Sequence, residues 1–190
     1  MCIMRIISGS ARGTKLYTLD GYETTRPTLD RVKEALFSKI AMNLPESIVL
    51  DLFAGSGALG LEAVSRGAEK AYLVDSSGKA IKIIKQNVTK THFEEKTVVL
   101  QEDYQVALEN FQNRNLAFDV VFLDPPYKTD FALQATKLIL ENKLLKDTGI
   151  LVIETDIEET VLPELEKLCA DVIDVKKYGR VTLIFIRRKG

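Results

Sequence analysis

Four consecutive residues, Asp124-Pro125-Pro126-Tyr127, combine a carboxylate, two rigid prolines and an aromatic ring. They follow an apolar run, residues 118–123, whose length and composition predict a buried β-strand. Because the prolines lack an N–H and fix their own φ angles, the strand ladder ends there and backbone carbonyls remain free to accept hydrogen bonds. A carboxylate and a carbonyl can orient an exocyclic amine, and an aromatic ring can stack on a base. We therefore predict chemistry at an amino nitrogen of a nucleobase, with all four residues as the catalytic set.

A second motif suits a nucleoside cofactor and reads Asp51-Leu52-Phe53-Ala54-Gly55-Ser56-Gly57-Ala58-Leu59-Gly60. It contains the pattern G-x-G-x-x-G between a predicted strand and a predicted helix. Asp75 lies 20 residues beyond Gly55, at the end of the next predicted strand. In this context the glycines let the backbone approach the ligand, and the acid accepts hydrogen bonds from ribose hydroxyls. Taken alone, this spacing fits either NAD or S-adenosylmethionine.

Asp51 shifts the choice of cofactor toward S-adenosylmethionine. A carboxylate there can hold the ammonium group of a methionine moiety, and it would repel a dinucleotide pyrophosphate facing the same site. Asp103 follows the third predicted strand, where it can reach an adenine amino group, cap the helix that begins at Tyr104, or do both. The predicted cofactor contacts are Asp51, Phe53, Ala54, Gly55, Ser56, Gly57, Asp75 and Asp103.

Strand-like and helix-like segments alternate from residue 48 onward. Apolar runs of strand length cover 48–52, 71–74, 97–100, 118–123 and 150–153, and helical patterns cover 59–66, 79–91, 104–111, 131–140 and 158–168. This alternation predicts right-handed crossovers and a mostly parallel sheet. The last two runs, 172–175 and 181–186, are joined by a link too short for a helical crossover, which predicts an antiparallel hairpin at the sheet edge.

The N-terminal segment has a different pattern. Short strand-like pieces at 5–7 and 15–17 flank a glycine-rich stretch, 9–13, which predicts a β-hairpin extension. A helix then begins at Arg26-Pro27 and ends before Pro45. The length of 190 residues fits a single domain, 1–190, with residues 1–27 as an N-terminal arm and 28–190 as the catalytic core.

The composition, 46% hydrophobic and 28% charged, is ordinary for a soluble globular protein. No apolar run is long enough for a membrane span, and Arg5 interrupts the start where a signal peptide needs its apolar stretch. We therefore expect a cytoplasmic protein without membrane contact. His92 is the only histidine, and the two cysteines have no metal-binding spacing. Histidine-based catalysis and metal sites are thus disfavoured.

A net charge of −1 means that any bound nucleic acid must be held by local clusters. The N-terminal segment supplies the predicted RNA contacts, which are Arg5, Arg12, Lys15, Arg26 and Arg31. The stretch 176–189 adds six basic residues and no acid. Either cluster, taken alone, is equally compatible with ordinary solvation of the surface.

Over nearly its whole length the chain resembles the RsmD family, bacterial methyltransferases that act on the exocyclic 2-amino group of a guanine in 16S ribosomal RNA. The resemblance is carried by residues 4–9, 12–16, 25–37, 51–63 and 123–127. It implies a Rossmann-like class I methyltransferase fold of the α/β class with a seven-stranded sheet in the order 3-2-1-4-5-7-6. It also implies S-adenosylmethionine as the cofactor and 16S rRNA or the assembling 30S subunit as the partner of a monomer.

Two departures from the family pattern stand out: Asp75 replaces the usual glutamate, and Ser8 and Ser10-Ala11 replace the usual glycine, lysine and tyrosine. Three alternatives stay open. An amino-methyltransferase of another RNA or of DNA would share residues 124–127. An NAD-dependent oxidoreductase would explain the glycines and Asp75 but not those residues. A non-catalytic RNA-binding assembly factor could keep the fold, although the acidic residues present at 51, 75, 103 and 124 argue against a catalytically inactive site.

Overall fold

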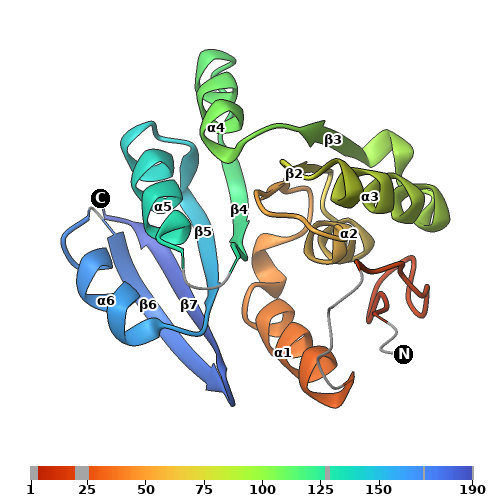
Figure 1. The fold of residues 1–190 in the computed structure, drawn as a ribbon, viewed down its shortest axis with the longest axis horizontal. Helices are drawn as coiled ribbons and strands as arrows, with labels where there is room; N and C mark the ends of the chain where they lie inside the picture. The colour runs from red at the N-terminus through yellow and green to blue at the C-terminus, as the bar shows by residue number, and fades with distance from the viewer. Residues whose placement is uncertain (1–3, 20–25, 127–128, 169, 190) are drawn as a thin grey trace.

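The computed structural model describes residues 4–19, 26–126, 129–168 and 170–189, with the backbone alone for 26–29. Seven strands form one sheet in the order β3-β2-β1-β4-β5-β7-β6 (Figure 1). The strands are β1 (Ile48–Asp51), β2 (Lys70–Asp75), β3 (Thr97–Gln101), β4 (Phe118–Leu123), β5 (Leu145–Thr155), β6 (Ala170–Tyr178) and β7 (Val181–Arg188). Strands β1 to β5 pair in parallel, and β7 is antiparallel to both β5 and β6. The predicted class I order and C-terminal hairpin are confirmed.

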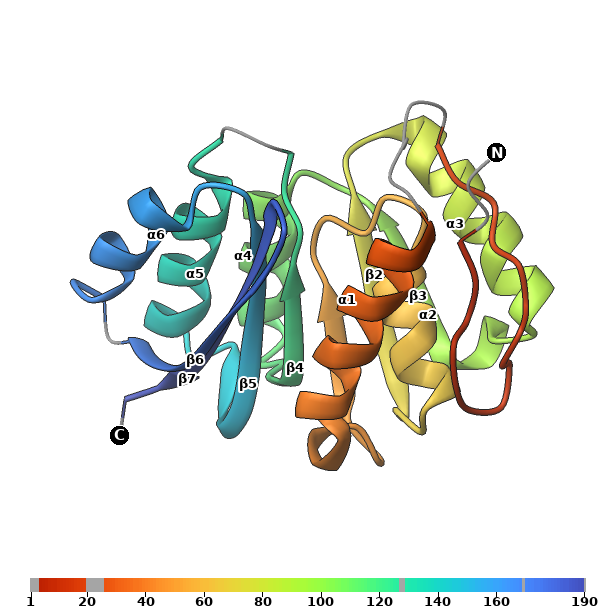
Figure 2. The ribbon, with the colours of Figure 1, turned by 90° about the horizontal axis from the view of Figure 1, so that it is seen from below.

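Helices cover both faces of this sheet (Figure 2). They are α1 (Arg26–Lys39), α2 (Ala58–Ser65), α3 (Gly78–Thr91), α4 (Tyr104–Asn113), α5 (Phe131–Glu141) and α6 (Glu158–Leu165), with short 3-10 turns at Ala41–Asn43 and Glu94–Lys96. Alternate strand residues enter two separate cores, one shared with α1, α2 and α3 and the other with α4, α5 and α6. This alternation follows from the period of two in a β-strand. No helix in the described stretches is long and apolar enough to cross a bilayer.

The N-terminal arm, residues 4–19, folds back on itself beside α2 and α3 (Figure 2). Its two limbs are joined by an isolated antiparallel bridge between Arg5 and Lys15, without regular strands. Leu16 N–H donates to the Met4 carbonyl at 2.8 Å, so the predicted hairpin path is present. The buried Ile6 and Leu16 side chains belong to the core under α1, α2 and α3. The boundary between arm and core at residue 27 therefore remains a prediction.

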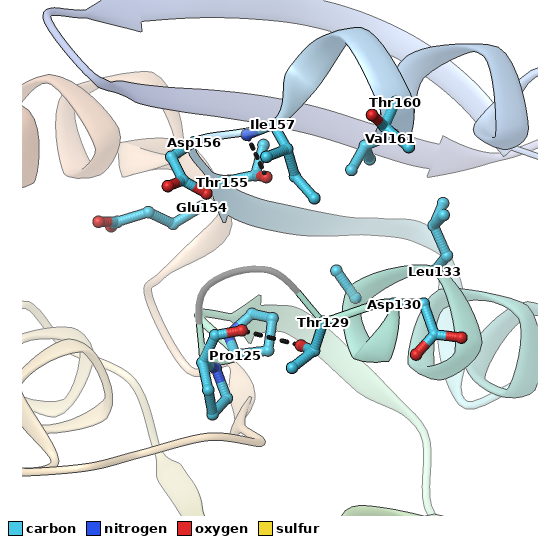
Figure 3. Close-up of a pocket in the computed structure, with 12 residues that line it drawn as sticks. Pro125, Thr129, Asp130, Leu133, Glu154, Thr155, Asp156, Ile157, Thr160 and Val161 are labelled. Carbon is cyan, nitrogen blue, oxygen red and sulfur yellow. Dashed lines mark hydrogen bonds between the residues drawn. The ribbon is translucent and has the colours of Figure 1, made fainter.

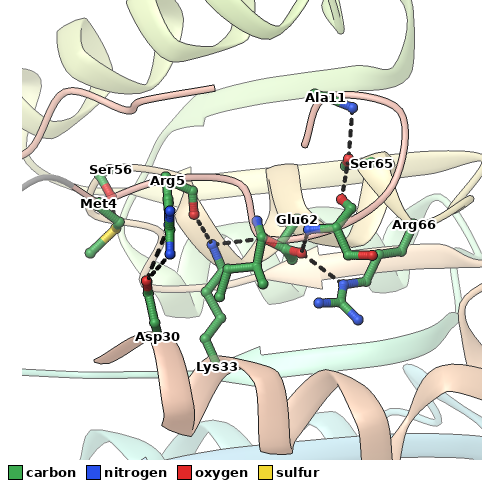
Figure 4. Close-up of polar contacts among 12 residues, drawn as sticks. Met4, Arg5, Ala11, Asp30, Lys33, Ser56, Glu62, Ser65 and Arg66 are labelled. Carbon is green, nitrogen blue, oxygen red and sulfur yellow. Dashed lines mark hydrogen bonds and ion pairs between the residues drawn. The ribbon is translucent and has the colours of Figure 1, made fainter. Parts of the chain in front are cut away.

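A buried ion cluster fastens the arm to α1 and α2 (Figure 4). Glu62 on α2 is fully buried, and its carboxylate accepts hydrogen bonds from the backbone amides of Ile7 at 2.8 Å and Ser8 at 3.0 Å. The same carboxylate pairs with Lys33 Nζ at 2.9 Å and Arg66 Nε at 2.7 Å. One carboxylate thus satisfies donors from the arm, α1 and α2.

Candidate active site

The carboxyl ends of β1, β2 and β4 bring the two sequence motifs together at one edge of the sheet. Asp51 is the last residue of β1, Asp75 is the last residue of β2, and Asp124 directly follows β4. These strands are parallel, and β1 lies between β2 and β4. The chain order reverses at this point, where open α/β sheets bind their ligands.

The loop after β1 has the backbone shape that a ligand cradle requires. Gly55 and Gly57 have positive φ angles of 56° and 78°. A Cβ added to Gly55 would meet nothing within 4 Å, so the backbone faces open space there. Gly60 has a different role, because a Cβ there would lie 2.2 Å from Leu73 Cδ2 and push α2 away from the sheet. The loop therefore fits the close approach of a nucleoside cofactor.

The Asp75 carboxylate hydrogen-bonds to this loop, and it also lies where a ribose contact is predicted. Its two carboxylate oxygens accept hydrogen bonds from Gly55 N–H at 2.9 Å and Ser77 N–H at 2.8 Å. Each oxygen retains a lone pair for a further donor, such as a ribose hydroxyl. The predicted ribose contact stays a prediction. The structure adds that Asp75 holds the glycine loop in place.

Asp51 is buried beneath the loop, with 1% of its surface exposed. It accepts the amide of Gly60, the third residue of α2, at 3.0 Å. That bond does the work of a helix cap, because the Gly57 at the N-cap position has no side chain to offer. Burial, reinforced by the nearby Asp124 and Asp75, raises the pKa of Asp51 to about 7 despite the Gly60 bond. Contact of Asp51 with a methionine ammonium remains a prediction.

An aromatic cluster forms a wall beside the cradle. The ring of Phe53 lies 5.4 Å from that of Tyr104 and stacks on Phe131 at 6.3 Å, measured between ring centroids. Sequence reasoning identified Phe53 but missed the other two. Tyr104 and Phe131 could have been predicted from their positions, because they are the first residues of the helices that follow β3 and β4.

The remaining predicted cofactor residues lie in the expected places with partners of their own. Asp103 is exposed and accepts the Gln105 amide at 2.9 Å, which confirms its role as the cap of α4 and leaves contact with adenine a prediction. The Ala54 amide donates to the Val74 carbonyl at 2.9 Å, which joins the loop to β2. Ser56 Oγ contacts Met4 Sδ of the arm at 3.5 Å.

The acceptor side begins where β4 ends. Asp124 and Pro125 are partly buried and Pro126 is exposed, while Tyr127, predicted to stack on the base, lies outside the described residues. Burial raises the pKa of Asp124 to about 7. The Pro126 carbonyl accepts the Thr129 hydroxyl at 2.8 Å (Figure 3).

A pocket of about 240 Å³ opens next to the two prolines (Figure 3). Its apolar lining includes Ala132, Leu133 and Val161, and its acidic lining includes Asp130 and Glu154. This mixture of an apolar floor and hydrogen-bond acceptors suits a base better than a phosphate, because negative charge on the lining would repel an anion.

Glu154 near the end of β5 was missed by the sequence reasoning. It follows Ile153, which pairs with Leu123 of β4, so Glu154 stands beside Asp124. Burial, with a further contribution from Asp124, raises the pKa of Glu154 well above its ordinary value. The sequence signal for Glu154 was an acid directly after an apolar run, at the carboxyl end of a strand, as Asp124 is.

The structure describes the side chains of four of the five predicted RNA contacts, and RNA binding by these residues stays a prediction. Arg5 pairs with Asp30 of α1 at 2.9 Å, which gives it a structural partner (Figure 4). Arg12, Lys15 and Arg31 are exposed, and the side chain of Arg26 lies outside the described residues. The turn that carries Arg12 packs against the C-terminal end of α2, where Ser10 N–H donates to the Ser65 carbonyl at 2.8 Å. Because α2 runs back from the cradle, that turn lies at the opposite edge of the sheet from Asp124.

Comparison with known proteins agrees with this geometry. The family described as conserved hypothetical protein 95 matches residues 4–187. YlbH of Bacillus subtilis is 38% identical over 189 residues, covering 98% of this chain and 100% of its own. The Haemophilus influenzae protein named ribosomal RNA small subunit methyltransferase D is 39% identical over 160 residues, covering 84% of this chain and 82% of its own.

Solved structures extend the similarity to the whole fold. The Escherichia coli protein yhhF superposes with a TM-score of 0.80 at 29% identity, covering 99% of both chains. A hypothetical protein of Thermus thermophilus superposes with a TM-score of 0.78 at 29% identity, covering 96% of this chain and 98% of its own. The family match over almost the entire chain and these full-length similarities show that the chain belongs to the family described as conserved hypothetical protein 95, which is the RsmD family.

Proposed function

We propose that this protein transfers a methyl group from S-adenosylmethionine to the exocyclic 2-amino group of a guanine in 16S ribosomal RNA. One observation carries the proposal: the glycine cradle after β1 and the Asp124-Pro125 acceptor site after β4 lie on neighbouring strands. A cofactor on the first and a base on the second would face each other. The name of the Haemophilus influenzae relative supports small-subunit RNA as the substrate.

The chain's own residues supply the cofactor side of this reaction by shape and charge. The positive-φ turn at Gly55 and Gly57, open at Gly55, accommodates the methionine part, and Asp75 lies where it can accept ribose hydroxyls. S-adenosylmethionine itself supplies a methyl group that is bonded to a positively charged sulfonium sulfur. The sulfur is the leaving group and ends as a neutral thioether. No strong base is then needed before transfer, because the donor is already activated.

On the acceptor side, positioning is the main contribution. The Asp124 carboxylate and the Pro125 carbonyl can each accept one hydrogen of the amine, which turns its nitrogen toward the methyl group. In the described part of the chain no donor occupies the Pro125 carbonyl. When the nitrogen gains the methyl group and a positive charge, its proton can pass to Asp124, whose raised pKa of about 7 suits a group that accepts a proton near neutral pH.

Family membership and the acceptor site both argue against the NAD-dependent alternative, but Asp51 does not. The Gly60 amide already occupies the Asp51 carboxylate, and burial raises its pKa to about 7. Its repulsion of a pyrophosphate is therefore weaker than its formal charge suggests. A calorimetric panel of S-adenosylmethionine, S-adenosylhomocysteine and NAD would compare the two cofactor classes directly.

We also propose that the partner is 16S rRNA or the assembling 30S subunit in the cytoplasm and that the enzyme acts as a monomer. Donor and acceptor residues come from one chain, so a second copy is not needed to complete the site. Sedimentation of the enzyme alone and with small subunits would test both points.

The test of the proposed function is transfer of tritium from labelled S-adenosylmethionine to small subunits and to naked 16S RNA, both from a strain lacking this protein. Nucleoside analysis should find N2-methylguanosine as the labelled product. Asp124→Ala should abolish transfer, whereas the control Glu159→Ala, at an exposed acid of α6 outside the pocket lining, should keep it. Label on an adenine amine, or no label with the wild type, would contradict the proposal.

A further inference from the structure

Two carboxyl groups, not one, border the acceptor site. The last pair between β4 and β5 is Leu123 with Ile153, so Asp124 and Glu154 are the next residues along two adjacent parallel strands. Phe122 and Val152, two positions earlier, both point into the core shared with α1. Because side chains alternate along a strand, Asp124 and Glu154 project to that same face of the sheet. Strands lie about 4.8 Å apart, so the two carboxyl groups can act on one small ligand.

The pair has no visible structural purpose within the described residues. No cation and no hydrogen-bond donor among them lowers the pKa of either group, and burial raises both. Glu62 and Glu158, by contrast, each have a cation beside them, Lys33 and Lys177 respectively. Partial burial of an uncompensated carboxyl group opposes folding, and such groups are typical of functional sites.

Figure 3 shows where Glu154 is directed. Its side chain leaves the end of β5 and points away from Leu133 and Val161, the apolar lining of the pocket. Glu154 and Pro125 both line the pocket, which therefore connects the second carboxyl group with the acceptor motif. A base held by Asp124 and Pro125 would extend its ring edge toward Glu154.

The chemistry of guanine matches two adjacent acceptors. Its Watson–Crick edge presents the N1–H donor directly beside the exocyclic amine, whereas adenine presents an unprotonated N1 beside its amine. Enzymes that act on an extruded base read this edge by hydrogen bonds. We propose that Glu154 determines base specificity by accepting the N1–H of the target guanine while Asp124 holds the amine. This inference rests on the proposed guanine methylation and names the residue that would select the base.

The test uses a substrate that keeps the 2-amino group but lacks the N1–H. Two 16S RNAs, made by splinted ligation and reconstituted into small subunits, carry guanine or 2-aminopurine at the position first mapped with the wild type. 2-Aminopurine has neither the N1–H nor the 6-oxo group of guanine, and the Glu154 variants described next separate the two differences, because a carboxylate accepts from N1–H but not from an oxygen acceptor. The wild type should prefer guanine in kcat/KM by roughly ten- to a hundred-fold, the range for leaving one buried acceptor without its donor.

Variants of Glu154 then show whether this residue causes the preference for guanine. Glu154→Ala should lower kcat/KM for guanine by about the same factor, leave 2-aminopurine within roughly three-fold, and so remove most of the preference. Glu154→Gln, which keeps an acceptor oxygen, should retain most of it. Glu159→Ala, at an exposed acid of α6 outside the pocket lining, should leave the preference unchanged. Melting temperature and cofactor affinity, measured for each variant, verify that the fold is intact.

A wild type that methylates both RNAs equally well would overturn the inference. So would Glu154→Ala and Glu154→Gln variants that slow both RNAs by the same factor, because that result describes a proton acceptor or a structural group. Failure of the wild type to label either RNA is a different result, since it contradicts the proposed function itself.

Discussion

Replacing Glu62 by alanine should destabilise the protein more than any surface substitution, because four donors converge on this carboxylate. It accepts from the amides of Ile7 and Ser8 and pairs with Lys33 and Arg66 at distances between 2.7 and 3.0 Å. Its side chain has 0% exposure, and that of Lys33 has only 10%. Burial lowers the pKa of Lys33, so the cation is destabilised by its location and depends on Glu62.

The magnitude follows from what the substitution leaves behind. Removing one partner of a buried ion pair typically costs about 3–5 kcal/mol, because the other charge stays buried without compensation. The two arm amides also lose their acceptor, but the arm can lift toward water and limit that part of the loss. We therefore expect Glu62→Ala to lower the free energy of unfolding by roughly 3–5 kcal/mol. Lys33→Met should cost less, since Glu62 would keep Arg66 and both amides.

The assay is equilibrium urea unfolding at about pH 7.5, where the carboxylate is ionised, with limited proteolysis to detect opening of residues 4–19. Glu164→Ala is the control, because its pair with Lys167 is exposed by 49% and 68% and should contribute less than about 1 kcal/mol. The double variant Glu62→Gln with Lys33→Met should recover much of the loss. A Glu62→Ala variant within about 1 kcal/mol of the wild type would refute the reasoning.

The pH dependence of this effect has a definite sign. Burial would raise the pKa of Glu62, but Lys33, the Ile7 amide and Arg66 outweigh it and hold the pKa below the ordinary value. A carboxyl group whose pKa is lower in the folded state stabilises the protein above its unfolded pKa and loses that contribution as the pH falls. The difference in stability between wild type and Glu62→Ala should therefore shrink on acidification.

Three further predictions concern the site and its partner. Because burial raises the pKa of Asp124 from 3.8 to about 7, kcat/KM should rise with pH through about 7. Asp124→Ala should abolish transfer, and because alanine carries no charge, the stability of this variant relative to the wild type should increase as the pH rises between those two values. Cofactor affinity measured by calorimetry should fall roughly ten- to a hundred-fold in Asp75→Ala; an unchanged Kd would place the ribose elsewhere. Neutralising Arg12 and Lys15 together should lower the log–log salt dependence of RNA binding by roughly 1.5 units at constant cofactor affinity, and an unchanged slope would make the arm structural only.

The sheet order and the place of the main acids could be predicted because both depend on local signals. Apolar runs of strand length and the links between them set the topology, and Asp51, Asp75 and Asp124 lie at strand ends in the structure. Strand β5 was predicted too short, at 150–153 instead of Leu145–Thr155. Its first half carries exposed polar residues, and it pairs with β4 through a register shift between Phe118 and Val120. That pairing depends on a neighbouring strand, so periodicity alone does not show it.

Charged side chains were harder to assign than strands, because their partners are distant in the sequence. Arg5 pairs with Asp30, 25 residues away, across the junction of arm and helix, and its predicted contact with RNA stays a prediction. Lys33 and Glu62 likewise meet only once the arm, α1 and α2 are packed together. Glu154 ends an apolar run without any motif around it, and its significance depends on the neighbouring strand that carries Asp124. In each case the spatial partner, not the residue type, decides the role.

The arm and the cofactor loop are also joined in a way that no motif indicates. Asn87 of α3 is fully buried; its amide oxygen accepts the Tyr17 N–H at 2.8 Å, and its amide nitrogen donates to the carbonyls of Tyr17 at 2.9 Å and Ser56 at 2.8 Å. One side chain thus holds both the return limb of the arm and the glycine loop. Because Ser56 lies between the two positive-φ glycines, any displacement of the arm changes the support of the cradle. The arm therefore belongs physically to the cofactor site, and substitutions in it should be examined for cofactor affinity as well as for RNA binding.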